Sequence, residues 1–379
     1  MQASPVKVVH GVNPGDLRPA DLLALQQPVV LRGLVRDWPL VKHGTSAQAV
    51  VRYLCGFDSG KEITGYTGPP SIGGRYFYSN APGSIDGPVA GGVVVGGLAA
   101  GGVAGHPTGG MMGVDPNRTA ARAMNFVAER VGLTDYLNRM LQTLDRADAP
   151  SLYVGSTDVD TYLPGLRTAN DLGVGDAAFG GEEPRVSVWI GNRTIAATHY
   201  DMSNNIACCA VGRRRFTLFP PDQIANLYPG PLEPTPGGQV VSMVDLRAPD
   251  LERFPRFATA MACAQVAELE PGDAILYPAL WWHNVEALDP FNVMINYWWN
   301  TTPRFLDSPM AMLLQGLLSL RDRPLAEKQG WRAILDYYVF GDPDLAGAHL
   351  AESVRGVLGP IDANAARGLR AQMLERLNR

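Results

Sequence analysis

Residues 185–219 read RVSVWIGNRTIAATHYDMSNNIACCAVGRRRFTLF, and this stretch indicates the fold class of the chain. Its runs of β-branched and aromatic residues predict strands at residues 185–191, 197–211 and 214–219, with a turn at Gly212 between the last two. Because these strands are short and are separated by turns, they favour a barrel or jelly roll over alternating parallel βαβ units.

The strand-rich region extends from residue 151 to residue 300. Turn signals such as Pro271-Gly272-Asp273 and Asp289-Pro290 divide it. Further strands are predicted at residues 152–155, 239–244, 264–269, 274–277, 282–286 and 292–298. The chain is therefore expected to be mainly β, with helices flanking the strands.

The region before residue 120 mixes short α and β elements. Helices are predicted at residues 17–25 and 45–55, and strands at residues 28–33 and 75–78. Thr45 or Ser46 is the expected N-cap of the second helix. Residues 120–144 are Ala-rich with spaced apolar positions and predict a longer helix.

A glycine-rich insertion occupies residues 87–113. We interpret it as a flexible surface loop, and a lid over a neighbouring site is the alternative. Part of it, residues 88–105, carries no charge, but it is short for a membrane span of about 20 residues and consists largely of Gly and Ala. No membrane association is expected.

The last region is helical. Helices are predicted at residues 309–320, 326–339, 345–358 and 363–377, and they could pack on the barrel or on a second subunit. We therefore divide the chain into residues 1–119 with α/β elements and the insertion, 120–302 with the barrel, and 303–379 with these helices.

Composition narrows the class of protein. The 379 residues are 46% hydrophobic and 18% charged, which is enough apolar material for a sizeable core. The net charge of −5 argues against a large nucleic-acid interface, although a local basic groove stays open. The four cysteines form no CxxC pair or disulfide framework, and no signal peptide begins the chain, so a cytoplasmic location is expected.

Two histidines and an aspartate in the strand-rich region suggest a metal site. Alternate strand residues share a face, so His199 and Asp201 of Thr198-His199-Tyr200-Asp201 can project together into a barrel. His283 follows the Pro-Gly-Asp turn and one apolar strand, on the next segment of an antiparallel meander. Two His and one carboxylate suit Fe(II) with open positions, but a zinc hydrolase accepts the same set.

A run of three arginines offers a candidate for binding an anionic co-substrate. Strand alternation turns Arg214 to the opposite face from Arg213 and Arg215, so only part of the run can point inward. An arginine fork binds a carboxylate with two hydrogen bonds. A solvated basic turn is the alternative.

These motifs resemble those of the cupin-like, Jumonji-C-type Fe(II)/2-oxoglutarate-dependent oxygenases. Within that family, the resemblance is to the asparaginyl hydroxylase that inhibits the hypoxia-inducible factor and to its bacterial relatives. The matching pieces are T-H-Y-D (198–201), Asn205, G-R-R-R-F-T-L-F-P-P-D-Q (212–223), L-Y-P (227–229), D-L-E-R-F-P (250–255), P-G-D (271–273), Y-P-A-L-W-W-H (277–283) and N-Y-W (296–298). The resemblance implies a double-stranded β-helix, or cupin, core.

The resemblance also implies roles for particular residues. His199, Asp201 and His283 would form the catalytic Fe(II) site, where O2 also binds. Arg214 falls where the hydroxylase has a lysine for the distal carboxylate of 2-oxoglutarate, and Tyr153 resembles a tyrosine with the same partner.

Four further positions follow from the resemblance. Asn205 and Asn296 match positions near the metal and 2-oxoglutarate. Ala196 stands where the hydroxylase has a threonine that supports the carboxylate. Trp298 would pack beside the iron site, with an ordinary core role as the alternative.

The implied activity is hydroxylation of a protein or peptide side chain, by a homodimer joined through its C-terminal helices. Oxidation or demethylation of a tRNA base or a small molecule is an alternative, although the acidic charge weakens the nucleic-acid version. A non-catalytic cupin-like binding protein and a metalloenzyme independent of 2-oxoglutarate also remain open.

Overall fold

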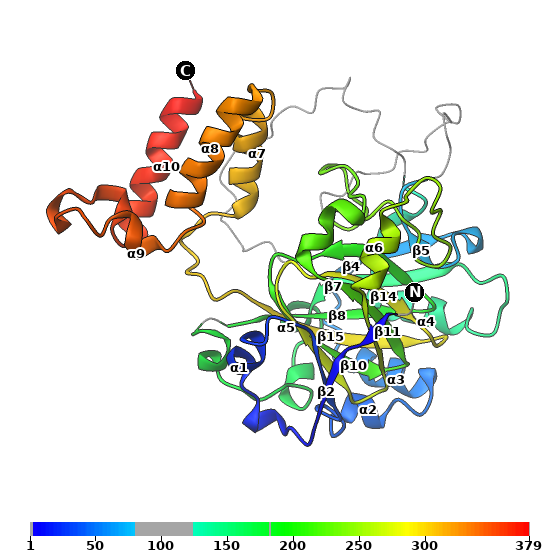
Figure 1. Ribbon diagram of the computed structural model, residues 1–379. Helices are drawn as coiled ribbons and strands as arrows, with labels where there is room; N and C mark the ends of the chain where they lie inside the picture. Colours follow the sequence, from blue (N-terminus) through cyan, green and yellow to red (C-terminus); the bar gives the residue numbers. More distant parts are fainter. Residues whose placement is uncertain (1–2, 80–123, 182, 379) are drawn as a thin grey trace. The chain divides into compact units, whose positions relative to one another are not determined.

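Two β-sheets make up the core of the computed structural model, which describes residues 3–79, 124–181 and 183–378 (Figure 1). The smaller sheet has the strand order β1 (Ser4–Pro5), β12 (Gln265–Leu269), β11 (Arg214–Phe219), β14 (Trp282–Ala287), β9 (Ile195–Tyr200) and β5 (Arg75–Tyr76). The larger has the order β2 (Lys7–His10), β3 (Val29–Arg32), β13 (Ala274–Tyr277), β10 (Asn204–Val211), β15 (Asn292–Trp299), β8 (Arg185–Gly191), β7 (Ser151–Asp158), β4 (Glu62–Gly68) and β6 (Val127–Gly132). The glycine-rich insertion 87–113 lies outside the described residues.

The chain passes repeatedly between the two sheets. β9, β11, β12 and β14 belong to the smaller sheet, whereas β10, β13 and β15 belong to the larger one. Strands β8, β15 and β10 lie side by side in the middle of the larger sheet (Figure 1). This arrangement confirms the predicted jelly-roll, or cupin, core.

The inner faces of the two sheets meet in an apolar interior. Ala207, Ile275 and Met294 come from the larger sheet, and Phe216 and Leu218 come from β11 of the smaller one. All five are buried, because alternate residues of each strand point to this face. The interior supports the inward-facing polar residues described below.

The outer face of the larger sheet forms a second apolar cluster with helices from the N-terminal half. These are α1 (Pro19–Leu23), α2 (Pro39–Lys42), α3 (Ala47–Cys55), α4 (Leu133–Leu141) and α5 (Val159–Tyr162). Ser46 caps α3 by accepting a hydrogen bond from the backbone N–H of Ala49, as predicted for one of the two candidate caps. α6 (Phe257–Ala262) packs in a separate cluster beside Phe219.

Short 3₁₀ turns connect the larger elements. They lie at Pro14–Asp16, Pro70–Ile72, Leu166–Thr168, Asp176–Phe179, Pro221–Asn226, Glu352–Val354 and Gly356–Leu358.

The helix predicted over residues 120–144 is wrong in its described first half. Residues Val127–Gly132 form strand β6, and only Leu133–Leu141 is helical. β6 pairs antiparallel with β4 from Glu62↔Gly132 to Thr67↔Val127. Pairing with this distant strand overrides the local helical pattern.

The single strand predicted over residues 197–211 is also wrong. It is divided into β9 and β10, which belong to different sheets, and the chain turns at residues 201–203 between them. The antiparallel meander that was expected to place His283 on the strand next to residues 274–277 is also wrong. β14 pairs with β11 and β9 rather than with β13, the strand that precedes it.

Two other predicted elements are absent from the described residues. Residues 239–244 form only isolated bridges, which join Val241 to His199 and Ser242 to Pro229. The helix predicted over residues 345–358 is replaced by α9 (Pro343–Ala346) and two 3₁₀ turns. The backbone of Gly356 has a positive φ of 53°, which interrupts a helix at that point.

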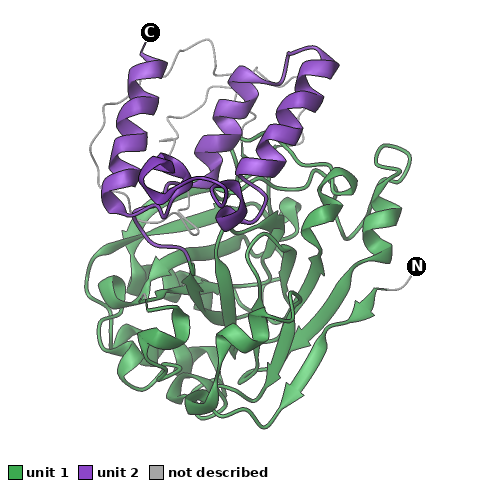
Figure 2. Cartoon of the chain, turned by 60° about the vertical axis from the view of Figure 1, so that its left-hand side comes forward, with its two compact units in different colours: residues 1–301 green, residues 302–379 purple. Residues whose placement is uncertain are grey.

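Residues 302–379 form a compact unit separate from residues 1–301 (Figure 2). It contains α7 (Pro309–Ser319), α8 (Leu325–Tyr338), α9 and α10 (Ala363–Leu377). Ser308 and Asp362 cap α7 and α10 with their side chains. Among the helices that the structure describes in both units, none has the length and apolar character needed to cross a membrane.

A buried carboxylate joins the N-terminal strand β3 to the barrel. Asp273 accepts hydrogen bonds from Arg32 Nη1 at 2.5 Å and from the backbone N–H groups of Gly33 and Glu270, both at 2.9 Å. It is only 6% exposed, so its negative charge depends on these donors. This pairing explains how a chain segment far away in sequence is held against β13.

We expect Asp273→Ala to lower the free energy of unfolding by about 2 to 3 kcal/mol, because three donors lose their acceptor while Arg32 keeps partial access to water. Urea unfolding measures this change. Glu268→Ala is the control, since its pair with Arg215 is exposed and should contribute about 1 kcal/mol or less. Equal losses of unfolding free energy in the two variants would contradict a stabilising role for the Asp273 hydrogen bonds.

Candidate metal centre

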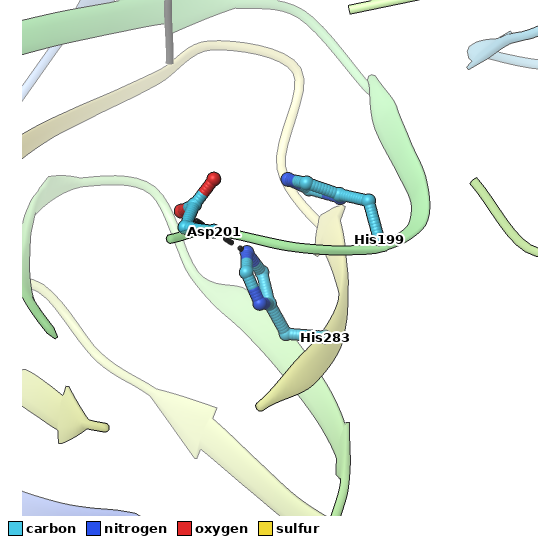
Figure 3. Close-up of side chains that lie close together, drawn as sticks. All are labelled: His199, Asp201 and His283. Carbon is cyan, nitrogen blue, oxygen red and sulfur yellow. Dashed lines mark ion pairs between the residues drawn. The ribbon is translucent and has the colours of Figure 1, made fainter. Parts of the chain in front are cut away.

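Three side chains converge at one end of the barrel interior. His199, Asp201 and His283 each present a ligand atom, and these atoms all lie within 4.8 Å of one another (Figure 3). The two imidazole ring centres are 4.3 Å apart, and His283 Nε2 lies 3.6 Å from Asp201 Oδ2. Among the described residues, this is the one group of three or more His, Cys, Asp or Glu side chains close enough to share a metal ion.

Strand pairing brings the two histidines together. His199 on β9 and His283 on β14 are directly opposite in the antiparallel ladder, so their side chains leave the same face. Asp201 lies one residue beyond the end of β9, in the turn that leads to the other sheet. Its backbone carbonyl accepts a hydrogen bond from the N–H of Leu280 at 2.8 Å, which ties this turn to the one before β14.

Hydrogen bonds prepare both imidazoles to donate an electron pair. Nδ1 of His199 lies 2.8 Å from the carbonyl oxygen of Ala197, and Nδ1 of His283 lies 2.9 Å from that of Trp281. Because a carbonyl only accepts, each Nδ1 carries a proton, and Nε2 is the atom of each ring that faces a metal ion. Burial, followed by the neighbouring His199, lowers the pKa of His283 to about 4, so this ring is neutral at neutral pH.

The donor set fits a divalent metal ion. Asp201 is 3% exposed, and its Oδ1 has no hydrogen-bond partner among the described residues. A buried carboxylate with a free oxygen, beside two free Nε2 atoms, is stabilised by a cation placed between them. Two His and one carboxylate alone suit iron or zinc, so the choice between them depends on the rest of the cavity.

The arginine run is divided between the two faces of β11, as its alternation predicts. Arg213 pairs with Asp289, and Arg215 pairs with Glu268 and Glu286 on the exposed side. Arg214 is 2% exposed and points inward.

Arg214 carries a buried charge with two donor atoms unsatisfied by the described residues. Its Nε and Nη2 have no hydrogen-bond partner among the described residues, and burial lowers the pKa of the guanidinium. Arginine nevertheless stays charged in proteins, so this site favours an anion. Tyr153 lies beside it, and burial raises the pKa of the Tyr153 hydroxyl, which therefore stays protonated and can donate to the same anion.

A buried hydrogen-bond network adjoins Asp201. Asn205 Nδ2 donates to Tyr277 Oη at 2.6 Å and lies 3.4 Å from Asp201 Oδ2, while Asn296 Nδ2 donates to Asn205 Oδ1 at 2.8 Å. Asn296 Oδ1 has no partner among the described residues. Burial, and then the charge of Asp201, raises the pKa of Tyr277 well above its usual range. Tyr277 lies in the motif Y-P-A-L-W-W-H, but its sequence position gave no sign of this contact.

A single cavity contains all seven residues that the sequence singled out as metal or cofactor ligands. It encloses about 900 Å³ of empty space, its open mouth included. Ala196 and Trp298 also line it, and the Trp298 indole N–H has no partner among the described residues. Sequence reasoning missed the aromatic part of the wall, because these side chains come from scattered elements: Tyr66, Tyr76, Phe126 and Trp189.

Comparison with known proteins gives a family match and several relatives. The cupin-like domain model matches residues 14–305. The HSPB1-associated protein 1 homolog of Danio rerio is 37% identical over 126 residues, which cover 32% of this chain and 27% of that protein. The lysine-specific demethylase JMJ31 of Arabidopsis thaliana is 31% identical over 129 residues, with 32% and 23% coverage.

A third relative is the tRNA wybutosine-synthesizing protein 5 of Danio rerio, which is 35% identical over 106 residues, or 28% of this chain and 29% of that protein. The chain thus spans less than a third of the length of each of these relatives.

Proposed function

Because the chain belongs to the cupin-like domain family, we propose that it is an Fe(II)- and 2-oxoglutarate-dependent oxygenase of the Jumonji-C type. The observation that carries this proposal is Arg214, a buried cation whose Nε and Nη2 have no hydrogen-bond partner among the described residues, in the cavity that also holds His199, Asp201 and His283. A hydrolytic zinc site needs no such buried cation. A dicarboxylate that chelates the metal accounts for both features.

The residues that line the cavity would have different roles toward the metal and the co-substrate. His199, Asp201 and His283 would hold Fe(II) and leave coordination positions open toward the cavity. Arg214 and Tyr153 would hold the distal carboxylate of 2-oxoglutarate by a guanidinium fork and a protonated hydroxyl. When bound, Fe(II), 2-oxoglutarate and O2 supply the oxidation of a C–H bond, with succinate and CO2 as by-products.

The rest of the cavity would position the substrate and exclude water. Its wall contains Tyr66, Tyr76, Phe126 and Trp189, whose apolar surfaces keep the reacting centre dry. The indole N–H of Trp298, which has no partner among the described residues, offers a donor to a polar substrate group. Positioning a substrate C–H bond beside the metal is the contribution expected from the protein itself.

We propose that the substrate is a protein or peptide side chain, which is hydroxylated as in the asparaginyl hydroxylases. The net charge of −5 supports this choice over a tRNA, because binding a polyanion depends on neutralising phosphates. The wybutosine-synthesizing relative keeps a tRNA base as the second candidate, and the demethylase relative keeps demethylation open. The complete His-Asp-His set argues against a non-catalytic binding protein.

A turnover assay tests this proposal. The chain is incubated with Fe(II), 2-oxoglutarate and separate libraries of peptides, metabolites and tRNA, with His199→Ala as the control. We expect succinate release and a peptide mass gain of one oxygen atom, both lost in the control. Formaldehyde release or a modified nucleoside would instead support the alternatives, and no succinate with any library would contradict the oxygenase.

We also propose that the chain is cytoplasmic, because its four cysteines are all free thiols, as in a reducing compartment.

A homodimer through the C-terminal unit is the accompanying proposal. Large apolar side chains of α7 and α8 are exposed in that unit, among them Leu318 at 77%, Leu325 at 69% and Trp331 at 45%. Such patches mark interaction surfaces.

We expect light scattering to give twice the mass of 40.8 kDa, and Leu318→Glu with Trp331→Glu to give the single-chain mass. Arg321→Ala, exposed in the same unit, should stay dimeric, and a monomeric unmodified chain would contradict the proposal.

A further inference from the structure

We propose that Tyr277 is a positioning residue that acts through Asn205 on the Asp201 carboxylate. The inference rests on the proposed function, because it takes Asp201 to be a metal ligand. It does not depend on which substrate is oxidised. It assigns a role to a hydroxyl that neither the family motif nor the co-substrate site explains.

The contacts form a chain of fully buried groups. The Asn205 amide uses both of its ends: Nδ2 donates to Tyr277 Oη at 2.6 Å and approaches Asp201 Oδ2 at 3.4 Å, and Oδ1 accepts from Asn296 Nδ2 at 2.8 Å. Asn205 is 0% exposed, Tyr277 and Asn296 are each 2% exposed, and Asp201 is 3% exposed. Water therefore cannot replace any of these partners without a rearrangement.

The main chain, rather than a flexible side chain, brings the hydroxyl to the amide. β10 lies between β13 and β15, and Asn205 is directly opposite Tyr277 on one side and Trp298 on the other. Residues opposite each other in antiparallel strands point to the same face. The tyrosine ring also packs against the metal-site histidine His283, with ring centres 4.7 Å apart.

The short bond to Tyr277 and the bond from Asn296 hold the two ends of the amide, and the Tyr277 bond is the shorter of the two. The contact between Asn205 and Asp201 is long at 3.4 Å and weak by itself. The last torsion of an asparagine is broad and roughly two-fold, so an unrestrained amide could turn its oxygen toward the carboxylate. Among the described residues, Asn205 is the hydrogen-bond donor that reaches this carboxylate. Its orientation therefore determines how Asp201 faces the metal.

The expected size of the loss in metal affinity is taken from other protein metal sites. Loss of a partner that orients a metal ligand typically costs about 10- to 100-fold in metal affinity. Tyr277 stands one step further away, so we expect the lower end of that range, about tenfold. Asn205→Ala should cost at least as much, because it removes the direct donor.

The test compares Tyr277→Phe with Tyr297→Phe. Tyr297 is an equally buried tyrosine on β15 whose hydroxyl donates to Asp171 Oδ1 at 2.7 Å, but it belongs to the outer cluster and does not line the cavity. Both changes remove one buried hydroxyl; Tyr277 loses its hydrogen bond with Asn205, and Tyr297 loses two, since its hydroxyl also accepts from the backbone N–H of Leu172 at 3.2 Å. Binding of Co(II), an oxygen-stable stand-in for Fe(II), is measured by titration, and its visible spectrum reports the ligand geometry.

We expect Tyr277→Phe to weaken Co(II) binding about tenfold and to change the spectrum. Tyr297→Phe should lower thermal stability while leaving Co(II) affinity and spectrum unchanged. If the two variants bind Co(II) alike, or if Tyr277→Phe matches the unmodified chain, the positioning role is overturned.

A double-mutant cycle tests the route through Asn205. In an Asn205→Ala background, Tyr277→Phe should cause no further loss of Co(II) affinity. A tenfold loss that persists there would show that Tyr277 acts by another route and would overturn the proposal. Failure of the unmodified chain to bind Co(II) would overturn the metal site itself, and with it this inference, so the two failures are distinguishable.

Discussion

Replacing Asp201 by alanine is expected to lower Fe(II)-dependent turnover of 2-oxoglutarate by about a thousandfold or more. Metal chemistry lowers the barrier by several kcal/mol, and each 1.36 kcal/mol corresponds to about a tenfold rate. Asp201 supplies the one carboxylate of the candidate metal set, and its loss leaves only the two imidazoles. Succinate release under saturating Fe(II) measures the effect.

Asp289→Ala is the matched control for this variant. Asp289 is also a carboxylate beside the barrel, but it pairs with Arg213 on the exposed face and lies outside the cavity. Its replacement should leave turnover within about twofold, since its exposed pair contributes little to stability. If Asp201→Ala retained more activity than Asp289→Ala, the metal centre would have to lie elsewhere.

Replacing Arg214 by methionine is expected to raise the KM for 2-oxoglutarate by about a hundredfold. Removing one partner of a buried charged pair costs about 2 to 5 kcal/mol, and 1.4 kcal/mol corresponds to a tenfold change in affinity. The variant should also raise the thermal stability of the ligand-free chain, because a buried cation with two donor atoms unsatisfied by the described residues is replaced by an apolar side chain of similar volume. Initial rates at varied 2-oxoglutarate and thermal unfolding measure the two effects.

The neighbouring arginines provide the control for the co-substrate site. Arg213→Met and Arg215→Met remove the same charge one residue away, but both side chains point to the exposed face. Their KM for 2-oxoglutarate should stay within about twofold, given the small contribution of exposed ion pairs. A uniform rise in all three variants would indicate a general charge effect and would contradict a specific carboxylate fork.

The barrel strands were predictable where their periodicity is local. The strands at Arg185–Gly191 and Arg214–Phe219 have the predicted limits, and alternation predicted that Arg214 faces the opposite way from Arg213 and Arg215, as the structure shows. The spacing of His199 and Asp201 likewise indicated that both could reach one site. For the arginine run the pleat of the strand determines the outcome, whereas Asp201 lies in the turn just beyond β9 and is held there by a contact with Leu280.

The remaining features depend on partners that are distant in sequence. Residues Val127–Gly132 became a strand because β4 pairs with them, although their local pattern predicted a helix. The break after Tyr200 arises because the next strand joins the other sheet. Tyr277 became part of the site because β13 pairs with β10 opposite Asn205. No local periodicity encodes a choice of partner strand, so these features required the structure.

The most direct test of the central claim is anaerobic titration of 2-oxoglutarate into the chain with and without Fe(II). If His199, Asp201, His283 and Arg214 form one site, 2-oxoglutarate should bind much more tightly to the Fe(II)-loaded chain. A visible charge-transfer band should then develop as the co-substrate chelates the metal. Equal binding with and without Fe(II), and no such band, would contradict the account.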